Sequence, residues 1–473
     1  MNKIVEVKAP NNPFLRDNFA PVDHELTEVC VEVIGEIPRE LEGAFLRIGS
    51  NPVFVADVEK YHWFDGDGMI HEVHFEGGKA TYRNRYVMTK GLKAELEKGD
   101  WIWKGLASVP DFTNSLGPMK NAANTAMVFH NRKLLALWEG GAPHHVTVPE
   151  LNTVGEVDFN GKLNHAFTAH PKLDPVTGEM IAFGYNMFMK PYCVHCVIDR
   201  DGNMTHQVAI DLPKGCMMHD CAITERYTLI LDLPVTGNLE AFMQGGPPLS
   251  WDPDNGARIG VLPRHGGGGD VRWFAIKTGF VFHTVNAYEE GDEVVLEACR
   301  SNKTNVVGAD SDTDAGMEDA PSLYEWRLDM KTGAVQERLL DGEHASEFPR
   351  INEAYMGRKH RYTYNARFDM TGAGMFDGII KYDRANDTAE HVAFGPGRHG
   401  GEAIFAPRPG GTDEDDGWTV NFVWDENAQR SECVVIDARN FAAGPVARIV
   451  MPGRVPYGFH AAWVDKDGIA SQA

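Results

Sequence analysis

The sequence predicts an all-β protein, and the architecture that it favours is a β-propeller. The chain consists largely of short predicted strands separated by turns, with few long stretches of helical periodicity. Gly accounts for 49 of the 473 residues, more than average usage, which suits many tight turns. One strand–turn–strand pattern also recurs along the chain at a regular interval.

That recurring pattern is an apolar or aromatic strand, an Asp, a few turn residues and a second strand. It is centred on Asp199, Asp329, Asp383 and Asp437, and the last three are spaced 54 residues apart. Stacked four-stranded blades give such an interval, although conventional propeller repeats are shorter, at about 40–50 residues. Hairpins of this kind occur in any all-β protein, so the interval favours a propeller over two sandwiches without excluding the latter.

The chain contains no Ser/Pro-rich or low-complexity stretch, so we expect one domain over residues 1–473. Two non-repetitive stretches, 88–126 and 234–268, predict helical or loop insertions that cover one face of the propeller. The second contains five large apolar side chains, which would either form a rim for a membrane or an apolar substrate or pack under the loop: Leu239, Phe242, Met243, Leu249 and Trp251.

Charge and composition exclude several classes of function. A formal net charge of −23 argues against a nucleic-acid partner and against broad docking on anionic lipid. The N-terminal residues lack the apolar region of a signal peptide, and no apolar run approaches the length needed to span a bilayer. Seven cysteines without a disulfide-rich spacing favour a reducing compartment, so we expect a cytoplasmic protein, peripheral to a membrane at most.

Four of the 19 histidines share a distinctive context. His170, His219, His283 and His460 each lie among apolar or small residues near a predicted strand start, separated by 49, 64 and 177 residues. Such wide separation fits one metal ligand from each of several blades, whereas the local motif HExxH, which is absent, places its ligands on one helix. Spacing alone does not select these four from the other histidines.

The selection depends on a resemblance to the carotenoid cleavage oxygenase family, which covers nearly the whole chain. Its blocks occur here in family order: NPFLRDNFAPVDHE, IPRELEGAFLRIGSNP, FDGDGMIHEVHF, ALWEGGAPH, AHPKLDPVTGEM, MHDCAIT, HTVNAYEE, EFPRIN, GEAIFAPRPG and HAAW. One departure is Ser50, where the family commonly has proline. The resemblance implies a seven-bladed β-propeller, with a helical or loop dome over the metal face and an apolar tunnel to an iron ion.

The resemblance also implies the composition of the site. The four histidines match the family's Fe(II) ligands, and three glutamates match residues that accept hydrogen bonds from them, in the pairs Glu139 with His219, Glu347 with His283, and Glu402 with His460. His170 then has no such partner. Imidazole suits iron of this class, and a carboxylate on the outer ring N–H fixes the tautomer and the ring orientation. Four ligands of an octahedron leave two positions for dioxygen and water.

The expected substrate is less sharply defined than the site. Thr125 matches a position whose methyl group shields an open coordination position, and three aromatic residues are expected to line the substrate: Phe64, Trp138 and Phe282. Each is equally compatible with ordinary core packing. The stilbene-cleaving branch usually has Lys directly before the first glutamate, where this chain has Trp138. We therefore favour a carotenoid or apocarotenoid, with a stilbenoid or phenylpropanoid alkene as the alternative.

The implied reaction is cleavage of a C=C bond with O₂ as cosubstrate, which yields two carbonyl products. The alkene supplies all the electrons, so no reductant is required, in agreement with the missing Rossmann fingerprint. The expected partner is an apolar small molecule, with weak membrane contact through the dome and no obligate protein partner. An isomerohydrolase-type relative and a non-catalytic binding propeller remain as alternatives.

Competing signals are weaker. Cys193 and Cys196 have a zinc-like spacing, but residues three apart on a strand point to opposite faces. The adjacent His144 and His145 are poorly placed to bind one ion together. The run Gly266–Gly269 lacks the ending of a phosphate-binding loop, and no GxSxG elbow predicts a hydrolase.

Overall fold

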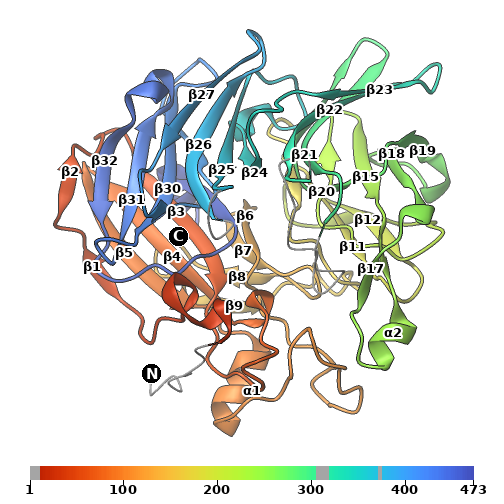
Figure 1. The fold of residues 1–473 in the computed structure, drawn as a ribbon, viewed down its shortest axis with the longest axis horizontal. Coiled ribbons are helices and arrows are strands. Elements are labelled where there is room, and N and C mark those ends of the chain that lie inside the picture. Colours follow the sequence, from red (N-terminus) through yellow and green to blue (C-terminus); the bar gives the residue numbers. More distant parts are fainter. Residues whose placement is uncertain (1–10, 305–318, 371–374, 473) are drawn as a thin grey trace. The chain divides into compact units, whose positions relative to one another are not determined.

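The computed structural model describes residues 11–304, 319–370 and 375–472 (Figure 1). Residues 1–10, on which the expected absence of a signal peptide largely rests, lie outside these ranges. The described residues form seven sheets of four or more strands and one two-stranded sheet. The seven larger sheets are the blades of a β-propeller, so the predicted all-β, seven-bladed fold is confirmed. No described helix has the length and apolar character that crossing a bilayer requires.

The chain divides into two compact units, and the first comprises Met1–Asp158 and Val392–Ala473. Its C-terminal strand β33 pairs with β3, and its N-terminal strand β2 pairs with β32, so two of its sheets combine both ends of the chain. Its first sheet has, in hydrogen-bonded order, β1 (Thr27–Val29), β5 (Lys79–Tyr86), β4 (Gly68–Glu76), β3 (Gly43–Ser50) and β33 (Ala461–Asp465). The second sheet has β6 (Ala126–His130), β7 (Lys133–Leu137), β8 (His144–Val146) and β9 (Thr153–Glu156). The third sheet has β2 (Val33–Gly35), β32 (Pro445–Val450), β31 (Arg430–Asp437) and β30 (Gly417–Asp425), and both β28 (Arg398–His399) and β29 (Ile404–Pro407) pair with β30.

The second unit, Phe159–His391, accounts for the other four blades. Each is a four-stranded antiparallel sheet in simple chain order, except that β16 and β17 interrupt one of them. The strands are β10 (Lys172–Leu173), β11 (Met180–Tyr185), β12 (Cys193–Ile198) and β13 (Met204–Ile210); β14 (Ala222–Ile223), β15 (Tyr227–Asp232), β18 (Ala257–Pro263) and β19 (Arg272–Ile276); β20 (Phe280–Glu290), β21 (Glu293–Ser301), β22 (Ser322–Asp329) and β23 (Val335–Leu339); and β24 (Ser346–Arg350), β25 (Tyr362–Phe368), β26 (Phe376–Asp383) and β27 (Thr388–Ala393).

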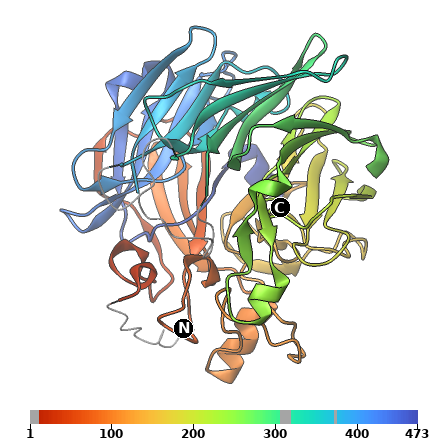
Figure 2. The same ribbon diagram turned by 45° about the vertical axis from the view of Figure 1, so that its right-hand side comes forward.

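Helices are short, and α1 (Lys90–Lys98) is the longest in the described residues. Thr89 caps its start by accepting a hydrogen bond from the backbone N–H of Leu92, and Gly99, at φ +74°, ends it in the left-handed region. Figure 2 shows α1 projecting from the strands of its own unit. The remaining helices are α2 (Leu239–Met243), α3 (Lys466–Ala470) and the 3₁₀ turns η1 (Pro13–Leu15), η2 (Asp17–Phe19), η3 (Trp63–Asp65), η4 (Pro253–Asn255), η5 (Gly268–Asp270), η6 (Glu353–Tyr355) and η7 (Ala438–Ala443).

The repeated Asp ends the third strand of a blade or directly follows it. In each case its carboxylate accepts hydrogen bonds from backbone N–H groups of the turn, for example those of Asp201 and Asn203 on Asp199, and of Lys331 and Thr332 on Asp329. This arrangement closes the turn locally, which is why Asp recurs there. The third strand β12 is fully buried, whereas the outer strand β13 alternates between buried and exposed residues.

The two predicted insertions differ in how well their limits hold. Residues 88–126 contain α1 and no strand before β6. Residues 234–268 contain β16 (Val235–Gly237), α2 and β17 (Leu249–Trp251), but β18 begins at Ala257 and is a blade strand, so the predicted end of this insertion was wrong.

The predicted apolar rim of the second insertion is only partly exposed. The side chains of Leu239 and Met243 are 44% and 51% exposed, whereas Phe242 and Leu249 are buried and Trp251 is half-buried. Two of the five residues therefore face solvent, whereas Leu249 and Trp251 pack with the core of the neighbouring blade strands and Phe242 stacks on Phe188.

The Asp383 turn generates a pH-dependent prediction. Hydrogen bonds from Arg361, at 2.8 and 2.6 Å, are the main cause that lowers the pKa of Asp383 to about 2. Asp383→Asn should therefore lower the thermal unfolding temperature at pH 7 by about 1–2 °C. A carboxylate with a lowered pKa stabilises the fold at a pH above its unfolded-state pKa, and this stabilisation is lost as the pH falls to the folded-state pKa. The difference in unfolding temperature between wild type and Asp383→Asn should therefore shrink between about pH 4 and pH 2.

Calorimetry at several pH values checks this expectation. Asp387→Asn, an exposed change in the same hairpin, is the control. If the difference in unfolding temperature between wild type and Asp383→Asn stays constant down to pH 2, the assigned role of the carboxylate is contradicted.

Candidate metal centre

The predicted ligands of the second unit lie at the first strands of successive blades. His170 is two residues before β10, His219 is three residues before β14, and His283 is the fourth residue of β20. First strands are short or irregular here, and the pairing of β20 with β21 shifts register between Val281 and Thr284. A bulge of this kind re-aims a side chain out of the regular alternation of a strand.

The rings of these three histidines face one another. The Nε2 atoms of His170 and His219 are 3.0 Å apart, and the His283 ring centroid is 5.2 and 5.1 Å from those of His170 and His219. Two lone pairs at such a distance repel unless a proton or a cation lies between them. Ligand nitrogens at right angles around a metal, each about 2.1 Å from it, would also be about 3.0 Å apart. The donor set therefore fits a transition-metal ion.

Glu347 orients the His283 ring. His283 Nδ1 donates a hydrogen bond to Glu347 Oε2 at 2.5 Å, and the same oxygen accepts one from the backbone N–H of Phe348 at 2.7 Å. Phe348, at φ +48°, stacks on the imidazole with a centroid distance of 4.9 Å. With its proton on Nδ1, the ring presents the lone pair of Nε2, which is the form that binds a metal.

The first unit contains the fourth predicted ligand in a similar arrangement. His460 lies directly before β33, and its Nδ1 donates a hydrogen bond to Glu402 Oε1 at 3.0 Å. The other oxygen of Glu402 accepts a hydrogen bond from the backbone N–H of Ala461 at 2.5 Å, and the side chains of Glu402 and His460 are buried. The predicted pairs of Glu347 with His283 and of Glu402 with His460 are therefore both present.

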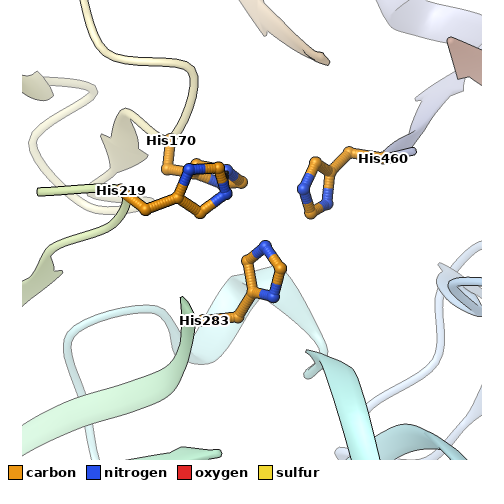
Figure 3. A group of neighbouring side chains, drawn as sticks. All are labelled: His170, His219, His283 and His460. Atoms are coloured by element: carbon orange, nitrogen blue, oxygen red, sulfur yellow. Dashed lines mark hydrogen bonds between the residues drawn. The ribbon is translucent and has the colours of Figure 1, made fainter. Parts of the chain in front are cut away.

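Figure 3 draws the four histidines. Within the second unit, His170, His219 and His283 each offer one ligand nitrogen within 4.8 Å of the other two, and the described residues of that unit contain no other group of three or more His, Cys, Asp or Glu residues within that limit. The pairing of Glu139 with His219 stays a prediction.

Thr125 and Phe282 each lie beside a predicted ligand. Thr125 precedes β6, its hydroxyl donates a hydrogen bond to Asn124 Oδ1 at 3.0 Å, and its carbonyl accepts one from the backbone N–H of His460 at 3.2 Å. Phe282 packs edge-on against the His219 ring at 5.4 Å. Their predicted roles towards dioxygen and substrate remain predictions.

Phe64 and Trp138 line the same cavity in the first unit, with a volume of about 460 Å³. Phe64 also packs edge-on against Phe459, the neighbour of His460, at 5.3 Å. Tyr61, Trp101 and Trp103 add further aromatic surface to the cavity wall. Two of the three residues expected to line the substrate thus line one cavity.

The cavity wall also contains buried charges, which the sequence analysis missed. Lys120 Nζ lies 2.5 Å from Asp67 Oδ1 and 2.5 Å from Glu95 Oε2, and all three side chains are at least nine-tenths buried. Burial alone would lower the pKa of Lys120, but the two carboxylates raise it above its usual value. Nearby, burial raises the pKa of Asp65 to about 6, although N–H donors from Leu106 and His62 oppose the shift.

The competing signals do not form alternative sites. Cys193 and Cys196 are both fully buried in β12, and burial raises the pKa of Cys196 to about 12, far from a metal-binding thiolate. His144 lies in β8 with its Nε2 3.9 Å from a carboxylate oxygen of Glu156. Residues Gly266–Gly269 form a turn before β19, in which Gly267 N–H donates a hydrogen bond to Asp270.

Comparison with known proteins decides the family. The model of the retinal pigment epithelial membrane protein family matches residues 19–465. The carotenoid 9,10(9′,10′)-cleavage dioxygenase of Crocus sativus is 41% identical over 97% of this chain and 90% of its own length. The chain belongs to the carotenoid cleavage oxygenase family. A carotenoid cleavage oxygenase of Mycobacterium tuberculosis is 34% identical over 96% of this chain and 97% of its own length.

Solved structures of this family share the fold. A lignostilbene dioxygenase of Pseudomonas brassicacearum has a TM-score of 0.89 at 31% identity and covers 96% of this chain and 99% of its own. A cobalt-substituted apocarotenoid oxygenase of Synechocystis has a TM-score of 0.84 at 29% identity, covering 94% and 97%. The resemblance seen in the sequence blocks is therefore confirmed, and the chain is an oxygenase of this family.

The buried cluster of Lys120, Asp67 and Glu95 predicts a strong effect on stability. Lys120→Met leaves two buried carboxylates without their cation, so the free energy of unfolding should fall by about 3–5 kcal/mol. Denaturant unfolding measures the loss. Lys104→Met, a change at an exposed lysine of the same cavity, should cost less than about 0.5 kcal/mol.

A double variant separates charge from packing. Adding Glu95→Gln to Lys120→Met removes one of the uncompensated charges and should recover part of the lost stability. Equal stability of the single and double variants would contradict the electrostatic explanation.

Proposed function

We propose that this chain is a non-haem Fe(II) dioxygenase that cleaves a C=C bond of a carotenoid or apocarotenoid into two carbonyl products. The observation that carries the proposal is the group of three imidazoles, His170, His219 and His283, that face one another at blade starts, with His283 donating Nδ1–H to Glu347. The proposed ligands are His170, His219, His283 and His460.

The identity of the metal is inferred from the donor set and from the family. All four proposed donors are imidazole nitrogens, which suit iron and other borderline metals, and no thiolate takes part. The Synechocystis relative was crystallised in a cobalt-substituted form, which supports a metal site in that protein. Bound Fe(II) would supply the coordination and activation of O₂.

The residues of the chain would position the reaction partners around that ion. Glu347 and Glu402 hold protons on the outer nitrogens of two imidazoles, so that both rings keep one orientation. The cavity with Phe64 and Trp138 would hold the apolar alkene and exclude water from the reacting bond. We propose Thr125 and Phe282 as further residues near the reacting groups, and Glu139 as the partner of His219.

The proposed substrate class rests on two observations. Several relatives that cover nearly the whole chain are carotenoid cleavage dioxygenases, among them those of Crocus sativus and Arabidopsis thaliana, each 41% identical. Trp138 lines the cavity and has no amine with which to bind a phenolate. The alternative is a stilbenoid or phenylpropanoid, because the lignostilbene dioxygenase has a TM-score of 0.89. A cytoplasmic location stays a prediction.

Incubation of Fe(II)-loaded protein in air with carotenoids, apocarotenals and hydroxystilbenes tests the substrate class. We expect aldehyde products from at least one carotenoid or apocarotenal, identified by mass spectrometry together with the cleaved bond. Aldehydes from the hydroxystilbenes alone would establish the alternative. No cleavage of any compound while iron is bound would contradict both.

Replacing Glu347 by Gln tests the orienting role of its carboxylate. The change keeps the size of the side chain but removes the charge that accepts His283 Nδ1–H, so affinity for Fe(II) should fall about 10–100-fold. Metal content after dialysis against a graded chelator measures the change. Glu353→Gln, at an exposed glutamate in η6, is the control, and equal iron retention by all three proteins would contradict the proposed role.

A further inference from the structure

We propose that Asp220 is a further positioning residue of the candidate metal site, because its carboxylate joins the chain segments that carry His170, His219 and His283. The inference rests on the proposed function, since it concerns the same three ligands. Asp220 directly follows His219, and only 1% of its surface is exposed. Neither the spacing of the histidines nor the pairing with glutamates points to it.

One oxygen of the carboxylate connects the first two segments. Asp220 Oδ1 accepts a hydrogen bond from the backbone N–H of Cys221 at 2.7 Å and lies 2.8 Å from Lys172 Nζ. Lys172 begins β10, two residues after His170, and its side chain is 12% exposed. An ion pair shielded from water to this degree holds its geometry better than a pair at the surface.

The other oxygen connects the third segment. Asp220 Oδ2 accepts a hydrogen bond from the backbone N–H of Thr284 at 2.8 Å and lies 2.8 Å from Thr284 Oγ1. Thr284 directly follows His283, and its hydroxyl is also 2.9 Å from the carbonyl oxygen of Cys221. The carboxylate thus fixes a backbone group two residues after His219 and another directly after His283.

The irregular backbone at His283 explains why such a connection is needed. The pairing of β20 with β21 is interrupted on both sides of Thr284, so the regular ladder does not hold this part of β20 in place. β14 has only two residues, and His219 lies outside it. A buried carboxylate with four donors supplies the orientation that the strands lack, and such partners of a metal site typically change affinity about 10–100-fold.

Direct metal binding tests the inference, with Fe(II) and Co(II) alone as probes. Asp220→Asn keeps the size of the side chain but loses the charge that binds Lys172. Its affinity for Co(II) should fall at least 10-fold, and the visible absorption spectrum of the bound Co(II) should change. Glu297→Gln is the control, because Glu297 is equally buried in the same unit and binds Arg384 instead. It should lower the unfolding temperature and leave metal affinity and spectrum unchanged.

A milder pair of variants covers the case in which Asp220→Asn does not fold. Thr284→Val removes the hydroxyl that contacts Asp220 and should weaken Co(II) binding, whereas Thr284→Ser keeps the hydroxyl and should restore it. Wild-type Co(II) affinity and spectrum in Asp220→Asn, or in Thr284→Val if the first variant is unfolded, would overturn the inference. So would an equal loss of affinity in Glu297→Gln.

The outcomes also separate this inference from the proposed function. Suppose that the wild-type protein binds metal, that Glu347→Gln binds it weakly and that Asp220→Asn binds it with wild-type affinity. This result rejects only the role of Asp220. A wild-type protein that binds neither ion overturns the proposed function and this inference together.

Discussion

The proposed site depends on which nitrogen of each imidazole carries its proton. A neutral imidazole has one N–H and one lone pair, and only the nitrogen with the lone pair can bind a metal. Glu347 and Glu402 accept hydrogen bonds from the Nδ1 atoms of His283 and His460, so that Nε2 carries the lone pair in both rings. The starts of the blade strands position the backbone of these histidines, and the carboxylates fix which nitrogen of each ring carries the proton.

The surroundings of the histidines are rich in buried polar groups, whereas the cavity wall is rich in aromatic side chains. The histidines require buried carboxylates and backbone donors around them, which are costly to bury unless each is paired. The cavity wall presents aromatic side chains, yet it also contains Lys120 and Glu95, which form an ion pair, and Lys120 pairs with Asp67 as well. In both places the buried charges are paired with other groups of the protein.

Local patterns in the sequence predicted the local structure well. The Asp of each hairpin was visible because its carboxylate bonds to the turn that it begins, as at Asp199 and Asp329. The predicted end of the second insertion was wrong, because the strand Ala257–Pro263 is followed within three residues by the run Gly266–Gly269, and composition alone does not separate the two. The four histidines were selected by their resemblance to a family, and the geometry agrees with the pairs formed by Glu347 and Glu402.

Residues whose role depends on distant partners were not predictable in the same way. Asp220 stands in a short motif beside His219, but its contacts with Lys172 and Thr284 exist only once three blades have formed. Lys120 likewise becomes a buried charge only through Asp67 and Glu95, which lie far from it in sequence. A sequence pattern records neighbours along the chain, whereas these roles arise from neighbours in space.

X-ray absorption at the iron edge of the Fe(II)-loaded protein is the most direct test of the central claim. The spectrum reports the atoms around the metal independently of catalysis and of the substrate. The account predicts the scattering pattern of four imidazoles, with nitrogen at about 2.1 Å and no sulfur. A fit that requires two imidazoles with a carboxylate, or any sulfur ligand, would contradict the four-histidine site.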